Sequence, residues 1–564
     1  MKKELLHEKR DFINIRDIVE WAGDEWRDRI AYSWKLSPSD PSPVRISFET
    51  LRRDVRSLAS ELLSMGCAGR HCAVIGKMSC DWALMYFSLL SIGAVIVPLD
   101  RDWTAEDLAD TTKKADVEFL FCDEDISEKA EVIESSVTLL APAVYMGAKD
   151  NECNVKTLTA LGEMKFIKNK NAYFEAPIDS YALALLVFTS GTTGKGKGVM
   201  LSQSCVISDV ADVLPYIDYG KKTIGLLPPH HTYGSSIMIL GHLMIGSEVY
   251  ISSGLRYITK ELREQKPEHL VLVPLYLETF YRRILATVEE KGKAKLLKNM
   301  MRMSNAVRHI GVDARARLFT SVTEAFGGKL KMVISGGASI NPEIVDFFES
   351  VGISTLNGYG ITECAPIVAV NRSVNPVKNS VGTVLDIDSV KIDEPNEDGE
   401  GEILVKGLNV MMGYYKDEEA TAEAFDEEGY FRTGDYGRLD GSTLYITGRK
   451  KNLIILSNGK NVYPEEIENV ISQYQGVVDV IVYEGQSRRG MEHNAIVAEI
   501  YPDKEYFEKN SIEDIKGYFK EKIAEYNKTA VPYKKVAQIK IRREEFPKNT
   551  LRKILRFKLD TTID

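Results

Sequence analysis

Apolar residues follow two different spacings in the first part of this chain. Between residues 47 and 63 they recur every three or four positions, which predicts an amphipathic helix. Residues 72–75, 94–99, 117–122 and 138–145 are instead short, continuous, β-prone runs. This alternation predicts an α/β fold with a doubly wound, mainly parallel sheet.

A new pattern begins after residue 450, where the chain turns polar and basic. A helix is expected to start near Pro464, because proline is favoured in the first helical turn. Further strands and a helix complete a small α+β unit, at 478–483, 495–500, 512–526 and 538–542. A chain of 564 residues is also too long for one core. We therefore predict domains at 1–450 and 451–564.

An apolar run at 182–188 ends abruptly in a loop with the composition of a phosphate-binding loop. Glycines permit positive φ angles and let backbone N–H groups face an anion. The glycines are 191, 194, 196 and 198, and the donors between them are Ser190, Thr192, Thr193, Lys195 and Lys197. A flexible surface loop is the alternative. The strand that leads straight into these donors favours phosphate binding.

The spacing of this loop fits two kinds of phosphate loop in part. Residues 191–197 match a Walker A motif, but Gly198 stands where a magnesium-binding Ser or Thr is required, and 199–202 starts a helix poorly. The segment Thr-Ser-Gly-Thr-Thr-Gly-Lys-Gly-Lys-Gly instead resembles the signature of adenylate-forming enzymes, the superfamily of acyl-CoA synthetases, luciferases and nonribosomal adenylation domains. Gly196 replaces the proline usual in that family, and we expect this to loosen the unbound loop slightly.

Two later motifs extend the resemblance. Asn-Gly-Tyr-Gly-Ile-Thr-Glu at 357–363 matches the family's Tyr-Gly-x-Thr-Glu. The match implies that Tyr359 stacks on adenine, Thr362 bonds the α-phosphate and Glu363 holds Mg²⁺, which prefers oxygen ligands. In Tyr-Phe-Arg-Thr-Gly-Asp-Tyr at 430–436, Asp435 is expected to accept the ribose hydroxyls, with Arg449 near the nucleotide.

The C-terminal part carries the last motif. Pro-Lys-Asn-Thr-Leu-Arg-Lys-Ile-Leu-Arg at 547–556 resembles the family's Pro-Lys-Thr-x-x-Gly-Lys-x-x-Arg, which puts the catalytic lysine at Lys553. Arg552 replaces the family's glycine. The resemblance also implies that Lys451, or its neighbour Lys450, is the hinge of the C-terminal domain, and that the loop around Gly459 lines the thiol channel.

The resemblance implies one complete set of nucleotide-site residues. The nucleotide is expected to contact Thr189, Ser190, Gly191, Thr193, Gly194, Lys195, Lys197, Gly336, Gly337, Ala338, Tyr359, Gly360, Thr362, Asp435 and Arg449. The catalytic residues would be Lys553, Glu363 and Thr192, and the metal ligands Thr189 and Glu363. Glycine at 336 and 337 is expected because a Cβ there would collide with the ligand.

The acyl pocket is expected around residues 228–245. His231 matches a family histidine at the edge of that pocket, with Gly234 and Gly358 as further substrate contacts; a purely structural histidine pair is the alternative. Residues 235–245 are apolar and rich in small side chains, which predicts a buried helix or a channel wall. They lack the acid that amino-acid-activating members carry, so an amino-acid substrate is disfavoured.

Composition narrows the class of protein. The chain is 44% hydrophobic and 27% charged, with a net charge of -10, which argues against a general affinity for nucleic acid or anionic membrane. Its seven cysteines form no CxxC pair, and no signal peptide or long apolar stretch is present, so a cytoplasmic protein is expected. Peripheral contact with lipid is left open.

A largely helical, basic insert at 278–328 resembles the long-chain fatty acyl-CoA synthetase branch. That branch implies a large N-terminal domain of doubly wound sheets with a small barrel-like part, and a small, mobile α+β lid. It also implies a ligase that uses ATP, Mg²⁺ and coenzyme A to convert a medium- or long-chain fatty acid to acyl-AMP and then acyl-CoA. The alternatives are a ligase that loads a carrier-protein phosphopantetheine, an aryl-acid ligase, and a nucleotide-binding relic without activity.

Overall fold

The computed structural model describes residues 5–147, 153–189, 196–308, 313–338, 340–456, 461–487, 495–548 and 554–563. Its contacts divide the chain into two compact units. The first takes in the described parts of Met1–Gly191, Lys195–Ser389 and Lys406–Gly429, and the second those of Val390–Val405 and Tyr430–Asp564. The domain boundary expected at residue 450 stays a prediction.

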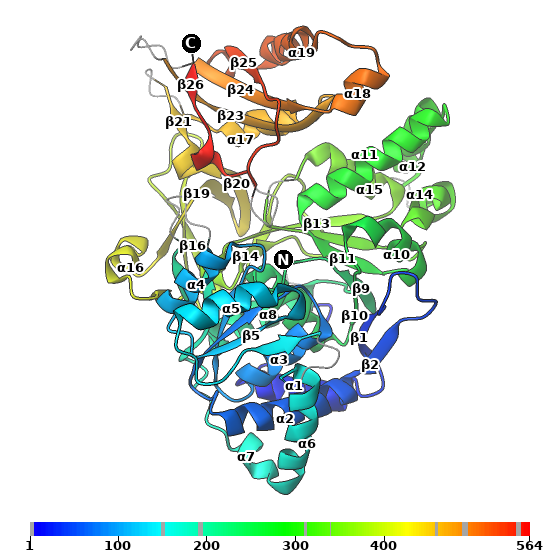
Figure 1. The fold of residues 1–564 in the computed structure, drawn as a ribbon. Coiled ribbons are helices and arrows are strands. Elements are labelled where there is room, and N and C mark those ends of the chain that lie inside the picture. Colours follow the sequence, from blue (N-terminus) through cyan, green and yellow to red (C-terminus); the bar gives the residue numbers. More distant parts are fainter. Residues whose placement is uncertain are drawn as a thin grey trace. The chain divides into compact units, whose positions relative to one another are not determined.

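A seven-stranded sheet forms the centre of one half of the first unit (Figure 1). Its strands, in spatial order, are β18 (Gly413–Tyr414), β8 (Gly198–Ser202), β7 (Leu183–Phe188), β4 (Val95–Leu99), β3 (His71–Ile75), β5 (Phe119–Asp123) and β6 (Val144–Met146). The five strands from β7 to β6 are parallel, whereas β8 and β18 are antiparallel. This matches the parallel sheet expected from the alternating pattern.

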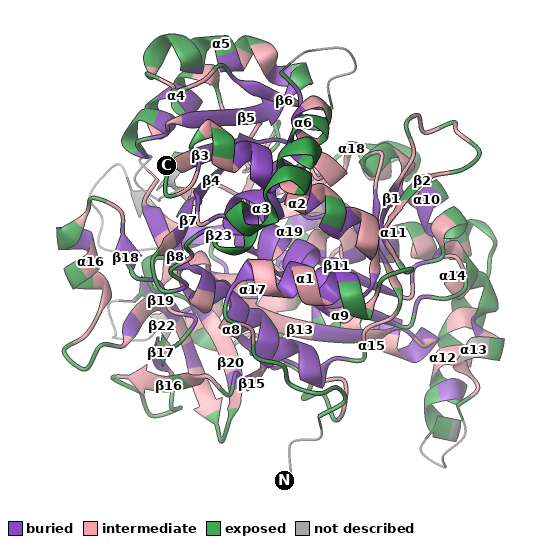
Figure 2. Ribbon diagram, turned by 90° about the horizontal axis from the view of Figure 1, so that it is seen from below, coloured by how far each residue is buried: buried purple, intermediate pink, exposed green. Residues whose placement is uncertain are grey.

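Helices cover both faces of this sheet. Figure 2 shows α4 (Ala105–Lys114) and α5 (Ser127–Ser136) on one side, and α2 (Phe48–Met65), α3 (Cys80–Leu90) and α6 (Val155–Lys168) on the other. The predicted helix at 47–63 is confirmed as α2. Ser47 caps it by accepting the N–H of Thr50, and Gly66 ends it in a left-handed conformation. Its apolar stripe, Leu51, Val55, Leu58 and Leu62, is fully buried.

Two further groups of strands complete the first unit. One sheet has the order β2 (Val44–Ser47), β1 (Ile30–Trp34), β10 (Glu248–Ile251), β9 (Lys222–Gly225). The other begins with β11 (His269–Leu272), β12 (Met332–Ser335) and β13 (Ser354–Gly360), which are parallel, and continues with the antiparallel β14 (Ile367–Val370) and β15 (Gly382–Val384). Parallel strands again place their carboxyl ends at one edge.

The basic insert at 278–328 is helical, as predicted, in its described residues. It contains α11 (Pro274–Glu290), α12 (Ala294–Arg308), α13 (Arg315–Leu318) and α14 (Thr320–Ala325), and α15 (Pro342–Val351) follows β12. Helices α11 and α12 lie side by side (Figure 1). Phe280, Phe319, Phe326 and Phe348 pack with the sheet residues into one core. The basic side chains, among them Lys295, Lys298 and Arg302, are on the exposed side.

The second unit has a β-rich part and a small α+β part. The first contains β16 (Asp388–Asp393), β17 (Gly401–Gly407), β19 (Phe431–Asp440) and β20 (Thr443–Arg449). The second has the sheet order β25 (Gln538–Ile541), β24 (Ala495–Pro502), β23 (Val477–Ser487), β26 (Thr562–Ile563), covered by α17 (Pro464–Ile471), α18 (Lys504–Lys509) and α19 (Ile515–Thr529). Pro464 opens α17, as predicted.

One expected strand is mostly wrong. Of the β-prone run at 138–145, only the last two residues belong to a strand, β6. Pro142 lies in this run and has no N–H to donate to a neighbouring strand, and Leu140 is largely exposed. The run therefore leads up to a short edge strand.

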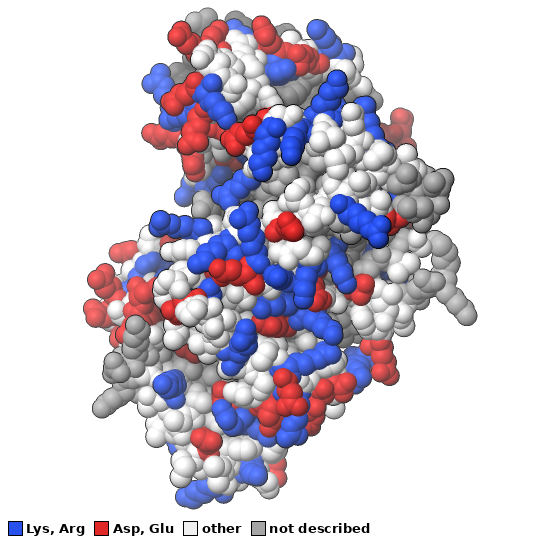
Figure 3. Space-filling view, turned by 90° about the vertical axis from the view of Figure 1, so that its right-hand side faces the viewer, with Lys and Arg blue, Asp and Glu red and all other residues white. Residues whose placement is uncertain are grey.

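The surface carries mixed charge. On the face drawn in Figure 3, basic and acidic side chains are interspersed. No helix within the described ranges has both the length and the apolar character needed to cross a bilayer.

A pair of histidines is fully enclosed in the first unit. The Nδ1 atom of His242 lies 2.9 Å from the Ile237 carbonyl and donates to it, so its Nε2 accepts from His269 Nε2 at 2.9 Å. Burial lowers the pKa of His242 to about 4 and holds the pKa of His269 well below its ordinary value. Both imidazoles are therefore neutral in the folded protein at neutral pH.

These histidines predict a loss of stability in acid. Below about pH 6.5 a histidine in the unfolded chain is protonated, whereas the buried histidine stays neutral. Each such group therefore lowers the free energy of unfolding by about 1.4 kcal/mol for each pH unit. The stability of the native protein relative to His269→Asn should fall as the pH is lowered from 7 to 5. Unfolding midpoints of both proteins across this range measure it, and a difference that does not change with pH would contradict the assignment.

Candidate active site

The phosphate-loop motif joins two antiparallel strands. At the end of β7, Thr189 donates its N–H to the carbonyl of Lys197 at 3.0 Å, and its hydroxyl lies 3.5 Å from the same oxygen. These two residues therefore close the loop at its base. The predicted contacts Ser190, Gly191, Thr192, Thr193, Gly194 and Lys195 lie outside the described residues.

Gly196 has a packing role that the sequence did not indicate. A Cβ on it would lie 2.5 Å from the Thr189 carbonyl oxygen, closer than real contacts allow. The ammonium group of Lys114, at the end of α4, donates to the Gly196 carbonyl at 2.9 Å. Glycine at this position thus lets the two sides of the hairpin approach, and the expected loosening of the unbound loop stays a prediction.

The segment after the loop excludes a Walker A site. Residues from Gly198 to Ser202 form strand β8, which pairs with β7. A Walker loop needs a helix N-terminus at this point to receive the phosphates. This confirms the prediction from the sequence that the loop is not a Walker A loop.

Tyr414 brings the first and second motifs together. It lies on β18, which pairs with β8 through Tyr414 and Val199. Its hydroxyl donates to Oε1 of Glu363 at 3.0 Å, while the ammonium group of Lys197 lies 4.5 Å from the centre of its ring. One tyrosine thus contacts both the predicted metal ligand and the predicted phosphate-binding lysine.

Burial and the neighbouring carboxylate keep the hydroxyl of Tyr414 protonated. Burial, first, and then the charge of Glu363 raise the pKa of its hydroxyl, so the group stays a hydrogen-bond donor at neutral pH. The main chain fixes Glu363 as well, because Met411 donates its N–H to the Glu363 carbonyl at 2.8 Å. Tyr414 was missed in the sequence analysis, because a tyrosine directly after Gly413 gave no chemical signal.

The second motif begins at the end of β13. Tyr359 pairs with Ala369 on β14, and Thr362 and Glu363 belong to a short 3-10 turn, Thr362–Cys364. Gly360 is needed for packing, since a Cβ would lie 2.2 Å from the Pro366 carbonyl, whereas the Gly358 position has only ordinary contacts. The nucleotide and substrate roles of these residues stay predictions.

The predicted acyl pocket and the glycine turn after β12 meet at one ring. A π-helix at Tyr233–Gly241 places the ring of Tyr233 where a Cβ on Gly336 would approach it to 3.1 Å. Gly337 has a φ of +85°, and Ala338 is exposed. Tyr233 therefore supplies a reason for glycine at 336 that we had assigned to the ligand.

The remaining acyl-pocket residues lie in the turn before this helix. A Cβ on Gly234 would lie 2.0 Å from the Pro228 carbonyl. His231 is half-buried, and its ring centre is 4.3 Å from that of His230. Residues 234–241 are buried, so the predicted buried helix is confirmed.

In the second unit, the two predicted nucleotide contacts pair with each other. Asp435 on β19 stands opposite Arg449 on β20, and the Arg449 Nε atom donates to Asp435 Oδ1 at 2.8 Å. The Asp435 residue is only 4% exposed. Lys450 forms an ion pair with Glu402 at 2.6 Å, which raises its pKa, and Lys451 follows it in a 3-10 turn. The hinge role stays a prediction.

Ion pairs hold both sides of the C-terminal motif. Lys553 and Gly459 lie outside the described residues. Before the gap, Lys548 pairs with Asp479 at 2.6 Å; after it, Arg556 donates to both carboxylate oxygens of Glu468 at 2.6 Å. Burial raises the pKa of Glu468 to about 7 against the opposing effect of Arg556.

The described residues contain no cluster of three or more His, Cys, Asp or Glu side chains able to hold a metal ion. Mg²⁺ is commonly held by one or two carboxylates together with substrate phosphates, and the prediction assigns it one carboxylate, that of Glu363. The hydroxyl of Tyr414 fixes Glu363 in the way that outer groups orient metal ligands. The site thus fits Mg²⁺ but does not resemble a dedicated protein cage.

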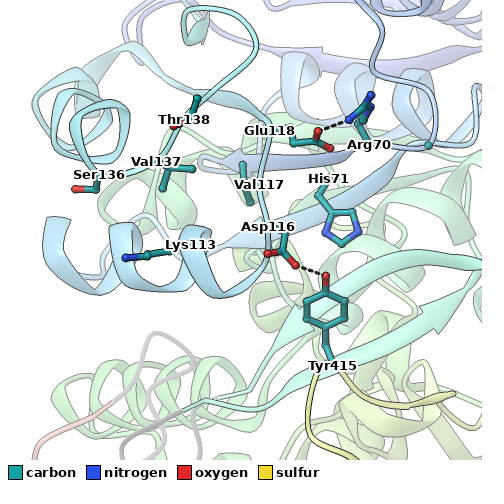
Figure 4. Close-up of a pocket in the computed structure, with 11 residues that line it drawn as sticks. Arg70, His71, Lys113, Asp116, Val117, Glu118, Ser136, Val137, Thr138 and Tyr415 are labelled. Carbon is teal, nitrogen blue, oxygen red and sulfur yellow. Dashed lines mark hydrogen bonds and ion pairs between the residues drawn. The ribbon is translucent and has the colours of Figure 1, made fainter.

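A separate open cavity of about 700 Å³ lies beside α4 (Figure 4). Asp116 and Tyr415 meet at one wall of it, where the Tyr415 hydroxyl donates to the carboxylate at 2.5 Å. Tyr415 adjoins Tyr414 in sequence, but its hydroxyl contacts this surface carboxylate and not Glu363. The pair of tyrosines therefore offers a matched comparison.

Known proteins match most of this chain. A family model described as AMP-binding enzyme matches residues 19–415. Long-chain-fatty-acid–CoA ligase 5 of Rattus norvegicus is 28% identical over an alignment of 478 positions that covers 78% of this chain and 68% of the relative. A long-chain-fatty-acid–acyl-carrier-protein ligase of Arabidopsis thaliana is 26% identical over an alignment of 567 positions that covers 87% of this chain and 76% of the relative.

Solved structures share the fold. The crystal structure of ATP-bound MatB from Rhodopseudomonas palustris has a TM-score of 0.73 and 22% identity, and the match covers 96% of this chain and 97% of that one. At this identity the likeness concerns the fold alone. The predicted α/β fold is confirmed.

The Tyr414 hydroxyl gives the first test of the site. Tyr414→Phe keeps the ring against Lys197 but removes the bond to Glu363, and loss of such an outer-shell bond typically weakens metal binding about 10- to 100-fold. We expect the Mg²⁺ concentration that half-saturates ATP–pyrophosphate exchange to rise by at least about 10-fold.

Tyr415→Phe is the matched control, because it removes the hydroxyl of the neighbouring tyrosine from Asp116. It should leave the Mg²⁺ requirement unchanged. Equal Mg²⁺ requirements in Tyr414→Phe and the native protein would show that Glu363 does not depend on this bond.

Proposed function

The chain belongs to the family of AMP-binding enzymes, and from this membership we propose that it is a fatty acid–CoA ligase. It would activate a medium- or long-chain fatty acid with ATP to acyl-AMP and pyrophosphate. It would then transfer the acyl group to coenzyme A and release AMP. The observation that carries the proposal is the contact of Tyr414 with both Lys197 and Glu363.

Charge explains why this arrangement suits adenylation. A carboxylate that attacks the α-phosphate brings two anions together and expels pyrophosphate as a third, so catalysis consists mainly of alignment and neutralisation. Lys197 and the loop donors would hold the phosphates, with Thr362 on the α-phosphate. Glu363 and Thr189 would hold Mg²⁺, which when bound neutralises charge on the phosphate oxygens.

The buried π-helix supports an apolar acid as the substrate. Its residues from Gly234 to Gly241 are buried and include no Asp or Glu to hold a substrate amine. The curated relatives bear names of long-chain fatty acid ligases, which supports the same class. An aryl acid is the alternative substrate.

The thiol that accepts the acyl group is supported by fewer observations than the acid substrate. The relative from Rattus norvegicus is named as a CoA ligase and the one from Arabidopsis thaliana as an acyl-carrier-protein ligase. We favour coenzyme A, with the phosphopantetheine of a carrier protein as the alternative. Acyl-AMP is a mixed anhydride, so either thiol can attack it once water is excluded.

The second unit would supply the remaining groups. Asp435 would accept the ribose hydroxyls, and Lys553 would neutralise charge during adenylation and then withdraw, which requires a movement about the hinge near Lys451. The convergence of positions 190, 363, 435 and 553 on one ATP is part of the proposal.

A panel of acids tests the function. Pyrophosphate release should be fastest with acids of medium or long chain, much slower with acetate and absent with amino acids, because only an apolar chain suits the buried segment at 233–241. Thioester formation from the best acid should be faster with coenzyme A than with a phosphopantetheinylated carrier protein. No pyrophosphate release with any acid would refute the proposal.

Lys553→Ala tests the division of labour. Removing one preorganised cation typically costs about 3 to 4 kcal/mol in the transition state, so adenylation should fall by about 100-fold or more. Thioester formation from supplied acyl-AMP should continue at nearly the native rate, because that step expels AMP without forming the pentacoordinate phosphorus. The two half-reactions are measured separately, and an equal fall in both would contradict the assignment.

A further inference from the structure

A second histidine beside the expected acyl pocket is enclosed with a carboxyl group. His230 is 7% exposed and Asp100 5% exposed. The Nε2 atom of His230 lies 3.5 Å from Oδ2 of Asp100. The centre of the His231 ring lies 4.3 Å from that of the His230 ring.

Neither ring nitrogen of His230 makes a hydrogen bond within the part of the chain that the structure describes. An unmatched buried polar atom is unfavourable, because it has lost its hydrogen bonds to water without gaining others. The other oxygen of Asp100, Oδ1, already accepts the N–H of Asp102 at 2.9 Å, which leaves Oδ2 toward the histidine. An orphaned, oriented imidazole of this kind is a candidate for contact with a ligand.

The position in the sheet points to the ligand-binding edge. Asp100 follows β4 directly, as Thr189 follows β7, and these two strands are parallel neighbours. Their carboxyl ends therefore lie at the same edge, which is where open α/β sheets bind ligands. His230 reaches this edge from the turn that also holds His231.

The imidazole of His230 is neutral at pH 7, because burial lowers its pKa to about 4. The carboxyl group of Asp100 would stabilise the imidazolium that forms when the ring takes up a proton. A neutral imidazole has one N–H and one nitrogen lone pair. A hydrogen bond from Nε2–H to Asp100 would leave Nδ1 as the acceptor, the arrangement by which a carboxyl group orients a histidine base.

We propose that His230, oriented by Asp100, is the proton acceptor for the attacking thiol in the second half-reaction. This rests on the proposed function. The thiol proton passes to the imidazole, and the sulfur forms a bond to the acyl carbon. The bond from that carbon to the phosphate oxygen breaks, AMP leaves with the electron pair, and the imidazolium then releases its proton to solvent.

The two half-reactions differ in their need for such a base. The fatty acid is already a carboxylate at neutral pH, so forming acyl-AMP requires no proton removal. A thiol with an ordinary pKa of about 8.5 is only a few per cent ionised at pH 7, so its attack gains from a positioned base. A base of this kind typically contributes about 10²- to 10⁴-fold.

His230→Asn and Asp100→Asn in the full chain test the proposal. We expect thioester formation from supplied acyl-AMP and coenzyme A to fall about 100-fold in His230→Asn and less in Asp100→Asn. ATP–pyrophosphate exchange should stay within about twofold of the native rate, because adenylation does not use the base. The exchange rate also reports whether each variant is folded.

The pH dependence separates a base from a merely structural histidine. As the pH rises past about 8.5 the thiol ionises without help, so the gap between His230→Asn and the native enzyme should narrow. His71→Asn is the control, because His71 lies at the opposite, amino end of β3 and lines the cavity in Figure 4. It should leave both half-reactions unchanged.

Three results would overturn the assignment: an equal loss in both half-reactions, no loss in either, or a gap that stays constant with pH. Failure of the proposed function would give a different result, because none of the acids tested would then support ATP–pyrophosphate exchange by the native enzyme. In that case supplied acyl-AMP still tests His230 through the thioester step alone.

Discussion

The bond from the Tyr414 hydroxyl to Glu363 is the contact on which the candidate site depends. Glu363 follows β13, Lys197 leads into β8, and Tyr414 comes from β18 more than 200 residues after Lys197. Three remote segments thus meet at one aromatic ring. Pairing of β18 with β8 positions that ring, so the sheet itself places the predicted phosphate-binding lysine and the predicted metal ligand on one tyrosine.

Anion chemistry requires groups that are held before the substrate arrives. Donors and charges that are already oriented need no reorganisation during the reaction, which makes them more effective than water. In the first unit the base of the loop is closed by Thr189 and Lys197, and Lys114 holds the Gly196 carbonyl. In the second unit Arg556 holds Glu468 beside the C-terminal motif. Both units therefore fix the framework around their motifs.

Much of the fold was predictable because it follows from hydrophobic periodicity. The strands at 72–75, 94–99 and 182–188 are short apolar runs that became buried strands, and the helix at 47–63 buries its apolar stripe. The prediction of a strand at 138–145 was mostly wrong, because it gave more weight to the β propensity of the run than to the missing N–H of Pro142. Edge strands are short, and their sequences constrain structure weakly.

The site was predictable only where chemistry shows in residue types. Glycine, lysine and carboxylate motifs are visible in a sequence, whereas contacts made by folding are not. The roles of Tyr414 and Tyr233, and the space constraint at Gly196, depend on strands and helices that are far apart in the chain. The buried pair His230 and Asp100 lies 130 positions apart for the same reason.

The most direct test of the central claim follows the oxygen atoms of the acid. A fatty acid labelled with ¹⁸O in its carboxylate is converted to the thioester in the presence of ATP, and the products are analysed by mass spectrometry. Attack of the carboxylate on the α-phosphate predicts one ¹⁸O atom in the phosphate of each AMP formed. Unlabelled AMP, or label in inorganic phosphate with release of ADP, would contradict an acyl-adenylate route.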